Sequence, residues 1–367
     1  MNLWRPELRV LVLWQGMSGY FDACLRRLAA TDGVEISLVY EAATSAAPFD
    51  AQNFAWLRGA YEWRGAPSAQ RLAEITESFA PDVILVSSWH IRPYRRIIAR
   101  RPDAVRVLCM DNQWLERPKQ WLGRVGSHWY VQRLFDAVFL PGDRQALFAR
   151  HLGFTQNRIL RGLYCADDQK YSRVRTPVGD RPPSFLFVGR LVEEKGLDTL
   201  LIGYADYRRC NSAPWDLHIA GTGPLLETCQ GAPGVTMHGF VQPADLPALL
   251  EQARCFVLPS RFEPWGVVIH EATLAGLAVI ASDAVGAVAH LVQDGFNGYV
   301  VPPGSPAAVA AAMSRVAALD DSALSLFSGG SRALANQFTT ARWSSYLLEG
   351  LAEAAAAKRM RVRMPSV

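Results

Sequence analysis

The chain contains the stretch Pro259-Ser260-Arg261-Phe262-Glu263-Pro264-Trp265-Gly266-Val267-Val268-Ile269-His270-Glu271-Ala272. It follows a short apolar run that indicates a buried strand, turns at proline and glycine, and opens a helix that ends before Gly276. A strand, a tight turn and a helix form the repeating unit of a parallel sheet with crossover helices. The stretch therefore predicts an α/β fold.

The same alternation extends outward from this stretch in both directions. Around it we expect strands at 184–188, 216–220, 235–237, 255–258, 278–281 and 298–301, with helices at 196–209, 224–230, 244–251, 267–275 and 306–318. In the first half we expect strands at 8–14, 34–40, 82–87, 104–110, 137–140 and 158–161, with helices at 19–30, 68–79 and 144–152.

Length and a change in composition indicate two domains. The 367 residues exceed what one hydrophobic core usually organises, and residues 176–183, rich in proline and charge, resemble a linker. We expect an N-terminal domain at 1–176, a C-terminal domain at 177–340, and over 341–367 a helix that returns toward the first domain, followed by a basic tail. Two doubly wound domains would form a cleft at the carboxyl ends of both sheets, where such folds bind ligands.

Composition narrows the class of protein. The six cysteines occur singly, which indicates neither a zinc site nor a redox motif and suits a cytoplasmic protein with reduced thiols. No apolar run is long enough to cross a bilayer. The basic excess lies in residues 1–180, where 24 Lys and Arg stand against 18 Asp and Glu. This basic excess would suit a surface that faces anionic lipid or an anionic acceptor, or it could come only from solvated arginines on helix faces. It is too sparse to predict a nucleic-acid partner.

The first stretch also carries two carboxylates eight residues apart. On a helix, Glu263 and Glu271 would lie about 12 Å apart along the axis and within about 80° of each other. That separation suits gripping both ends of an extended nucleoside diphosphate sugar, since carboxylates accept paired hydrogen bonds from vicinal hydroxyls. The amides of Gly266, Val267 and Val268 would face the diphosphate. Alternatively, Glu263 only matches the helix dipole and Glu271 lies on a wet helix face.

A second segment adds two cations at the end of another expected strand. It reads Phe185-Leu186-Phe187-Val188-Gly189-Arg190-Leu191-Val192-Glu193-Glu194-Lys195-Gly196-Leu197. Gly189 lets the backbone turn closely, and Arg190 with Lys195 could neutralise a diphosphate leaving group. The alternative is a pair of solvated cations.

Together these segments resemble the retaining GT-B glycosyltransferases with a Glu-x7-Glu motif, a group that includes bacterial mannosyl- and glucosyltransferases and glycogen synthases. The similarity covers nearly all of the second half and includes, in order, Ile219-Ala220-Gly221-Thr222-Gly223-Pro224, Gly239-Phe240-Val241, Ala275-Gly276-Leu277-Ala278-Val279-Ile280-Ala281 and Gly295-Phe296-Asn297-Gly298. It implies the GT-B fold, with two Rossmann-like doubly wound domains facing across a cleft. It also implies retaining transfer of a hexose-type sugar from a nucleoside diphosphate sugar to a glycan, lipid-linked or small-molecule acceptor.

The resemblance also implies roles for single residues. Arg190 and Lys195 would bind the diphosphate, Glu271 the ribose and Glu263 the transferred sugar, with Val241 near the base. The chain holds no Asp-x-Asp, so we expect neither a metal ion nor any cofactor besides the donor.

The first half resembles the group more loosely. Gly16 and Gly19 could let a loop approach the phosphates, although a plain strand-to-helix turn needs glycine too. In many relatives a histidine touches the donor sugar where this chain has Asp111, so either Asp111 or His90 would supply that contact. The arginines of 92–101 are candidates for peripheral contact with a membrane that carries a lipid-linked acceptor.

Other classes fit less well. A non-catalytic sugar-nucleotide-binding subunit would keep Arg190, Lys195 and Glu271 without needing Glu263, and a sugar-nucleotide epimerase shares the architecture. A dinucleotide dehydrogenase would need Gly-x-Gly-x-x-Gly after an early strand, which residues 16–19 do not supply.

Overall fold

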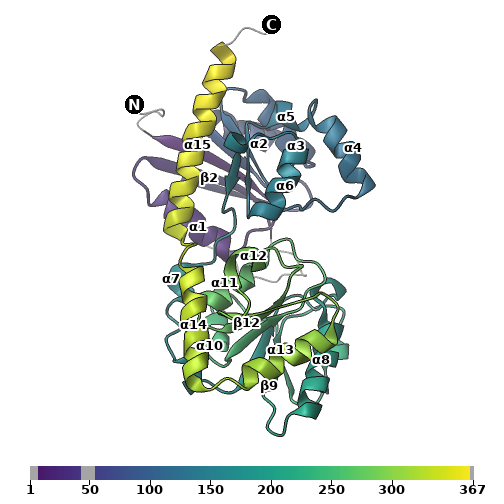
Figure 1. Cartoon of the computed structure of the whole chain (residues 1–367). Coiled ribbons are helices and arrows are strands. Elements are labelled where there is room, and N and C mark those ends of the chain that lie inside the picture. Colours follow the sequence, from purple (N-terminus) through teal and green to yellow (C-terminus); the bar gives the residue numbers. More distant parts are fainter. Residues whose placement is uncertain (1–6, 43–53, 364–367) are drawn as a thin grey trace. The chain divides into compact units, whose positions relative to one another are not determined.

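The computed structural model describes residues 7–42 and 54–363, which form two compact units. Unit 1 comprises Met1–Tyr164 together with Thr340–Val367, and unit 2 comprises Cys165–Thr339. Each unit contains one parallel sheet whose strands alternate along the chain with helices (Figure 1).

Unit 1 holds seven parallel strands in the order β3-β2-β1-β4-β5-β6-β7. The strands are β1 Leu8–Trp14, β2 Val34–Glu41, β3 Gly59–Trp63, β4 Val83–Val86, β5 Val105–Cys109, β6 Ala137–Leu140 and β7 Ile159–Arg161. The helices are α1 Gly19–Ala29, α2 Ala69–Phe79, α3 Arg92–Arg100, α4 Pro118–Ser127, α5 Val131–Leu134, α6 Asp143–His151 and α15 Thr340–Arg363, with a 3-10 turn η1 at Gln156–Arg158.

Unit 2 holds six parallel strands in the order β10-β9-β8-β11-β12-β13. The strands are β8 Ser184–Val188, β9 Asp216–Ala220, β10 Val235–Gly239, β11 Cys255–Leu258, β12 Ala278–Ser282 and β13 Gly298–Val301. The helices are α7 Asp168–Tyr171, α8 Leu197–Cys210, α9 Leu226–Cys229, α10 Leu246–Leu250, α11 Val267–Leu274, α12 Val288–Leu291, α13 Pro306–Ala317 and α14 Asp321–Ala335, with 3-10 turns η2 Val178–Asp180 and η3 Glu193–Lys195.

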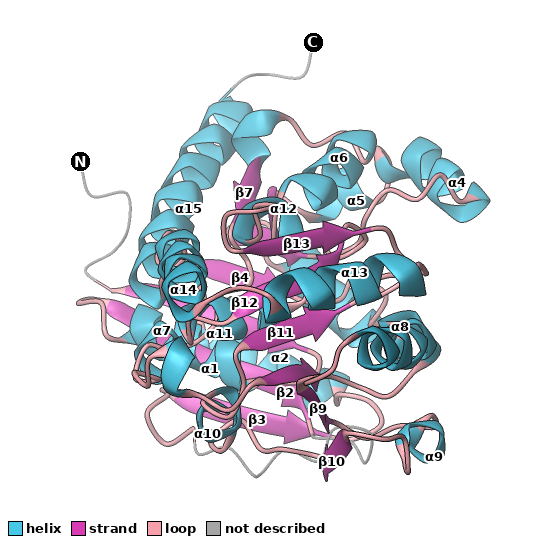
Figure 2. Ribbon diagram, turned by 60° about the horizontal axis from the view of Figure 1, so that its bottom comes forward, coloured by secondary structure: helices cyan, strands magenta, loops and turns pink. Residues whose placement is uncertain are grey.

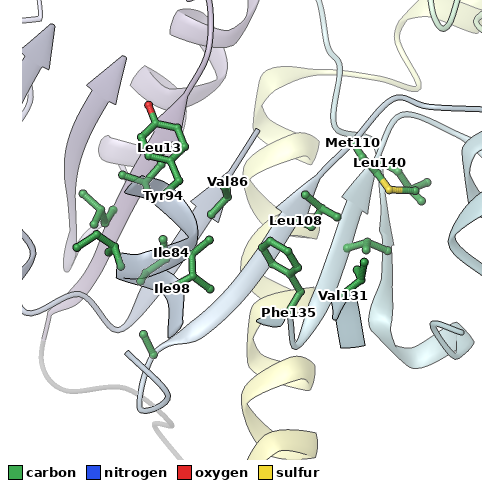
Figure 3. Close-up of a cluster of buried hydrophobic side chains, with 14 of the residues drawn as sticks. Leu13, Ile84, Val86, Tyr94, Ile98, Leu108, Met110, Val131, Phe135 and Leu140 are labelled. Atoms are coloured by element: carbon green, nitrogen blue, oxygen red, sulfur yellow. The ribbon is translucent and has the colours of Figure 1, made fainter. Parts of the chain in front are cut away.

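The core of unit 1 lies between its sheet and the helices that cover it. Figure 3 shows side chains of the strands, among them Leu13, Ile84 and Leu108, packed with Tyr94 of α3 and with Phe135 next to α5. All of these side chains are buried. The strands carry apolar residues at successive positions because helices cover both faces of a parallel sheet.

In unit 2, α8 and α13 pack against each other (Figure 2). Their close approach depends on Gly203, because a Cβ there would lie 2.8 Å from the carbonyl oxygen of Pro306. The hydroxyl of Ser305 accepts the N–H of Ala308 and caps the start of α13.

The boundary between the units lies after Tyr164, earlier than the expected change at 176–177. The segment after Tyr164 belongs to unit 2 because its backbone and side chains bond there. The N–H of Ala166 donates to Nδ1 of His270 (3.0 Å), and Arg332 donates to the carbonyl oxygen of Val174 (2.8 Å). Composition alone had placed the boundary at the proline-rich stretch that follows.

Helix α15 belongs to unit 1, where it packs along α1 (Figure 1). Lys358 donates to Asp136 (2.9 Å), which also pairs with Arg106 (3.1 Å), and the indole N–H of Trp343 donates to the carbonyl oxygen of Leu163 (3.0 Å). Residues 364–367 of the expected basic tail lie outside the described residues.

Candidate functional site

Both sheets have the strand order that leaves a crevice at their carboxyl ends. In each sheet the first strand along the chain lies next to the fourth, β1 beside β4 and β8 beside β11. The strands that follow the first and the strands that follow the fourth extend the sheet in opposite directions. In unit 2 the loop after β8 carries Gly189, Arg190 and Lys195, and the loop after β11 carries Glu263. The residues that the sequence singled out therefore lie where a doubly wound sheet binds its ligand.

Backbone and side-chain bonds join these two loops. The N–H groups of Arg261 and Phe262 donate to the carbonyl oxygen of Glu194, at 2.8 and 3.3 Å. Lys195 forms an ion pair with Glu263, and the two side chains are only 15% and 13% exposed. The structure thus brings one expected phosphate-binding cation into contact with the expected sugar-binding carboxylate.

Glycine makes this close docking of the loops feasible. Gly196 has a φ of +68°, and a Cβ there would lie 2.2 Å from the carbonyl oxygen of Pro259. The loop after β12 closes on the same segment, because the N–H of Gly286 donates to the carbonyl oxygen of Glu263 (3.1 Å). A Cβ on Gly286 would meet the carbonyl oxygen of Pro264 at 2.1 Å, so this third loop also requires glycine.

The loop after β9 docks on the other side of the loop that follows β8. The N–H of Leu191 donates to the carbonyl oxygen of Thr222 (2.8 Å), and a Cβ on Gly221 would lie 1.8 Å from the carbonyl oxygen of Gly189. Gly221 also donates to the carbonyl oxygen of Gly239 (2.6 Å), which places the partly exposed Val241 at the same edge of the sheet.

Glu263 lies on a loop, and its expected placement on the same helix as Glu271 is wrong. Helix α11 begins only at Val267, because Gly266 adopts a left-handed conformation with a φ of +90°. Glu263 is extended and forms an isolated parallel bridge with Val285. The helical distance and angle between the two carboxylates therefore do not apply, although both residues stay in the same unit.

The start of α11 keeps the geometry expected for an anion. The first amides of a helix, here those of Gly266, Val267 and Val268, have no partner within the helix. The side chain of Arg190 is exposed on the loop that follows β8.

Glu271 is partly buried rather than on a wet helix face. The hydroxyl of Tyr171, on α7, donates to Oε1 of Glu271 at 2.8 Å. Burial raises the pKa of Glu271 to about 7, although the hydrogen bond from Tyr171 acts in the opposite direction. Tyr171 itself is buried, and no local pattern predicts its contact with Glu271, because the two residues lie 100 positions apart.

His270, the neighbour of Glu271, has a structural role. Its Nδ1 accepts the N–H of Ala166, and its Nε2 lies 3.2 Å from the carbonyl oxygen of Ala335. Burial lowers the pKa of His270 to about 4, so the imidazole is neutral at physiological pH and ties α11 to two other segments of unit 2.

In unit 1 the corresponding loops follow β1 and β4. Gly16 has a φ of +70° with open space around its Cα, whereas Gly19 is the first residue of α1 and has no positive φ. The N–H of Gln15 donates to the hydroxyl of Ser87 (2.8 Å), which joins the two loops. The exposed His90 bonds through its ring to the hydroxyl of Ser88.

Asp111 follows β5 and accepts a hydrogen bond from Tyr164 at 3.1 Å. Burial raises the pKa of Tyr164 well above its ordinary value, so this residue is a hydrogen-bond donor at neutral pH. The ring of Tyr164 also contacts the edge of Tyr20, with 5.4 Å between centroids. Tyr164 and Tyr20 were not predicted, and within the described parts of the chain no hydrogen bond joins Asp111 to His90.

Two further properties concern metals and membranes. Within residues 7–42 and 54–363, no group of three or more His, Cys, Asp and Glu side chains is placed to hold a metal ion. Over the same residues, none of the helices combines the length and the apolar character that crossing a membrane requires.

The chain is similar to known glycosyltransferases. Residues 182–318 match the family described as glycosyl transferases group 1. Over 245 residues the chain is 34% identical to alpha-D-kanosaminyltransferase of Streptomyces kanamyceticus. This alignment covers 62% of the chain and 59% of that protein. Over 264 residues it is 35% identical to glycogen synthase of Mycobacterium tuberculosis, which covers 67% of this chain and 62% of that enzyme. The chain thus spans about three fifths of the length of these relatives.

Similar solved structures identify the fold. HepE of Anabaena, solved in complex with UDP, aligns with a TM-score of 0.69 over 94% of this chain and 100% of that one, at 19% sequence identity. With two Rossmann-like units in the strand orders given above, this likeness identifies the fold as GT-B, as the sequence predicted.

Proposed function

From the match of residues 182–318 to the family described as glycosyl transferases group 1, we propose that the whole chain is a retaining, metal-independent glycosyltransferase. It moves a hexose-type sugar from a nucleoside diphosphate sugar to a glycan, lipid-linked or small-molecule acceptor. The observation that carries the proposal is the ion pair of Lys195 with Glu263 at the switch point of unit 2, where a doubly wound sheet binds its ligand.

The ion pair is consistent with separate roles for Lys195 and Glu263 once the donor is bound. Before the donor binds, each charge neutralises the other in a partly buried position, which avoids an uncompensated charge. A diphosphate is a stronger partner for Lys195, because it carries more charge than one carboxylate. When Lys195 turns to the diphosphate, Glu263 becomes available to accept hydroxyl groups of the sugar.

The remaining groups of unit 2 bind the rest of the donor. Arg190, exposed on the same loop as Lys195, adds a second cation for the diphosphate, and the amides at the start of α11 add hydrogen-bond donors. Glu271 accepts a ribose hydroxyl through the oxygen that Tyr171 does not occupy.

In the transfer step, the bond from the sugar C1 to the diphosphate oxygen breaks and a bond from C1 to the acceptor oxygen forms on the same face of the ring. The acceptor proton passes to the departing phosphate, so no side chain is needed as an obligatory base. Lys195 and Arg190 stabilise the charge that develops on the diphosphate, which takes the place of a metal ion. Asp111 and His90 of unit 1 remain the candidates for contacts with the transferred sugar.

Acceptor-dependent release of nucleoside diphosphate tests the proposal. UDP-glucose, GDP-mannose and ADP-glucose are offered as donors, first alone and then with sugars, glycans and a lipid extract as acceptors. We expect release only when an acceptor is present, and loss of release in Glu263→Gln with donor binding retained. Binding without release under every condition would favour a non-catalytic subunit, and epimerised sugar nucleotide would favour an epimerase.

A further inference from the structure

Unit 1 exposes a cluster of large apolar side chains that the proposed sugar transfer does not use. Five of the ten large hydrophobic side chains exposed among the described residues fall within 121–130. We call Trp121, Leu122, Val125 and Trp129 the α4 surface; they are 47%, 75%, 68% and 63% exposed. Large contiguous apolar surfaces are uncommon on soluble proteins unless they bind something.

The α4 surface forms one stripe along the helix. At about 100° per residue, Trp121, Leu122 and Val125 span about 100° of the circumference of α4. The turn after the helix continues the winding, because the N–H of Trp129 donates to the carbonyl oxygen of Gly126 (3.2 Å), and at about 100° per residue Trp129 falls within the same stripe. The four side chains can therefore meet a flat apolar layer together.

Cations border the stripe on both sides. Arg124 lies about 60° from Trp121 on the helical wheel, and its guanidinium carbon is 5.4 Å from the centre of the Trp121 ring. Lys119 lies on the opposite border, about 60° beyond Leu122. An apolar stripe with tryptophan and basic borders is typical of helices that lie in the interface of a membrane.

The surrounding charge has the same sign. Residues 117–135 contain four Lys and Arg and no Asp or Glu. Helix α3, joined to α4 through α5, exposes Arg92, Arg96 and Arg100. Arg101, which the sequence analysis grouped with these arginines, is instead held against unit 1, because it donates to the carbonyl oxygens of Thr76 and Pro81, both at 3.2 Å.

The fold holds the α4 surface away from its own core. Helix α4 lies at the outer edge of unit 1 in both views (Figures 1 and 2). Trp121 contacts Trp114 edge to face (5.1 Å between centroids), and Trp114 stacks on His151 (4.0 Å). These contacts fix the orientation of the helix while Leu122 and Val125 stay exposed.

We propose that the α4 surface docks on an anionic lipid bilayer. Trp121, Leu122, Val125 and Trp129 enter the boundary between headgroups and acyl chains, while Lys119 and Arg124 lie against lipid phosphates. Charge complementarity selects lipid as the occupant, since the uniformly positive border matches a negatively charged layer. In combination with the proposed sugar transfer, on which this last step rests, docking brings the enzyme to an acceptor carried by a lipid.

Vesicle sedimentation of the full chain tests the proposal. The vesicles contain phosphatidylcholine alone or phosphatidylcholine mixed with phosphatidylglycerol. We expect wild type to sediment with the mixed vesicles, in a manner that salt weakens. Leu122→Ser/Val125→Ser should lower the partition coefficient by about tenfold or more, and Lys119→Glu/Arg124→Glu by a similar factor. Leu326→Ser is the matched control, because Leu326 is 73% exposed on α14 of unit 2, and it should sediment like wild type.

Three outcomes would overturn docking on lipid. They are no binding of wild type to mixed vesicles, unchanged binding of the Leu122/Val125 variant, and equal loss in the Leu326 control. Light scattering that shows a dimer in wild type and a monomer in the Leu122/Val125 variant would assign the surface to a second copy of the chain. Thermal shifts with nucleoside diphosphates, measured on the same samples, report the donor site separately. A failed donor site therefore cannot be confused with failed docking.

Discussion

Tyr171→Phe isolates one hydrogen bond at the proposed donor site. The variant removes only the hydroxyl that donates to Oε1 of Glu271 at 2.8 Å. Hydrogen bonds to charged groups contribute about 1.5–3 kcal/mol, and one pKa unit corresponds to about 1.4 kcal/mol. Losing the bond should therefore raise the pKa of Glu271 further above about 7 and make the carboxyl group about tenfold weaker as an acid.

The shift changes the pH dependence of donor binding. Only the ionised carboxylate offers all of its lone pairs to the ribose, so affinity should increase as the pH rises through the pKa of Glu271. At about pH 7.5 the ionised fraction falls from about three quarters to about one quarter, which weakens binding about threefold in the variant. The difference should shrink above about pH 9, where both proteins carry the ionised group.

Calorimetric titration with a nucleoside diphosphate between about pH 6 and about pH 9.5 measures this effect. Tyr204→Phe is the control, because Tyr204 is also buried in unit 2 but donates to the backbone oxygens of Trp215 and Gly234. Tyr204→Phe should lower the free energy of unfolding without moving the midpoint of the pH dependence of donor binding. A dissociation constant of wild type that does not change with pH, or a midpoint that Tyr171→Phe leaves unmoved, would refute the reasoning.

Four further changes test other parts of the account. Lys195→Ala removes a cation that would bind the diphosphate and takes the ion-pair partner from Glu263, so the dissociation constant of the donor, measured by calorimetry, should rise about 100-fold. The control Arg209→Ala, at an exposed position of unit 2, should leave that constant unchanged. Asp111→Asn should slow turnover and keep donor binding, and unchanged turnover in steady-state kinetics would remove its assigned role. Gly196→Ala should lower the free energy of unfolding, measured in urea, by about 3 kcal/mol or more. The control Gly231→Ala should cost about 1 kcal/mol, because Gly231 also has a positive φ but a Cβ there would meet no atom within 4 Å. Equal losses would show that the loops are not tightly docked. Addition of EDTA should leave the transfer rate unchanged, and a rate that falls with EDTA and returns with magnesium would rule out metal-independent transfer.

Much of the fold follows from hydrophobic runs in the sequence. Buried strands of a parallel sheet are short and continuously apolar, and the run Cys255–Leu258 is one example whose ends match the structure. The edge strand Gly59–Trp63 was missed because it is partly exposed and carries charged and aromatic residues instead of an apolar run. Helix α4 was missed because its apolar side chains face outward, which a search for core-facing periodicity does not detect.

The candidate site was predictable only for residues that directly follow a recognisable strand. Strand-end position indicated Lys195 and Glu263, since loops that follow adjacent parallel strands lie at the same edge of the sheet. The partners Tyr171 and Tyr164 depend on packing between distant segments, and no local pattern marks them. The left-handed backbone at Gly266 makes helix α11 begin after Glu263, so the helical geometry assumed for Glu263 failed.

A crystal structure of the chain grown with a nucleoside diphosphate sugar tests the central claim most directly. We predict the diphosphate within hydrogen-bond distance of Lys195 and Arg190, a ribose hydroxyl on Glu271, and the carboxylate of Glu263 turned from Lys195 to the sugar. A nucleotide bound elsewhere, with the ion pair of Lys195 and Glu263 intact, would contradict the account.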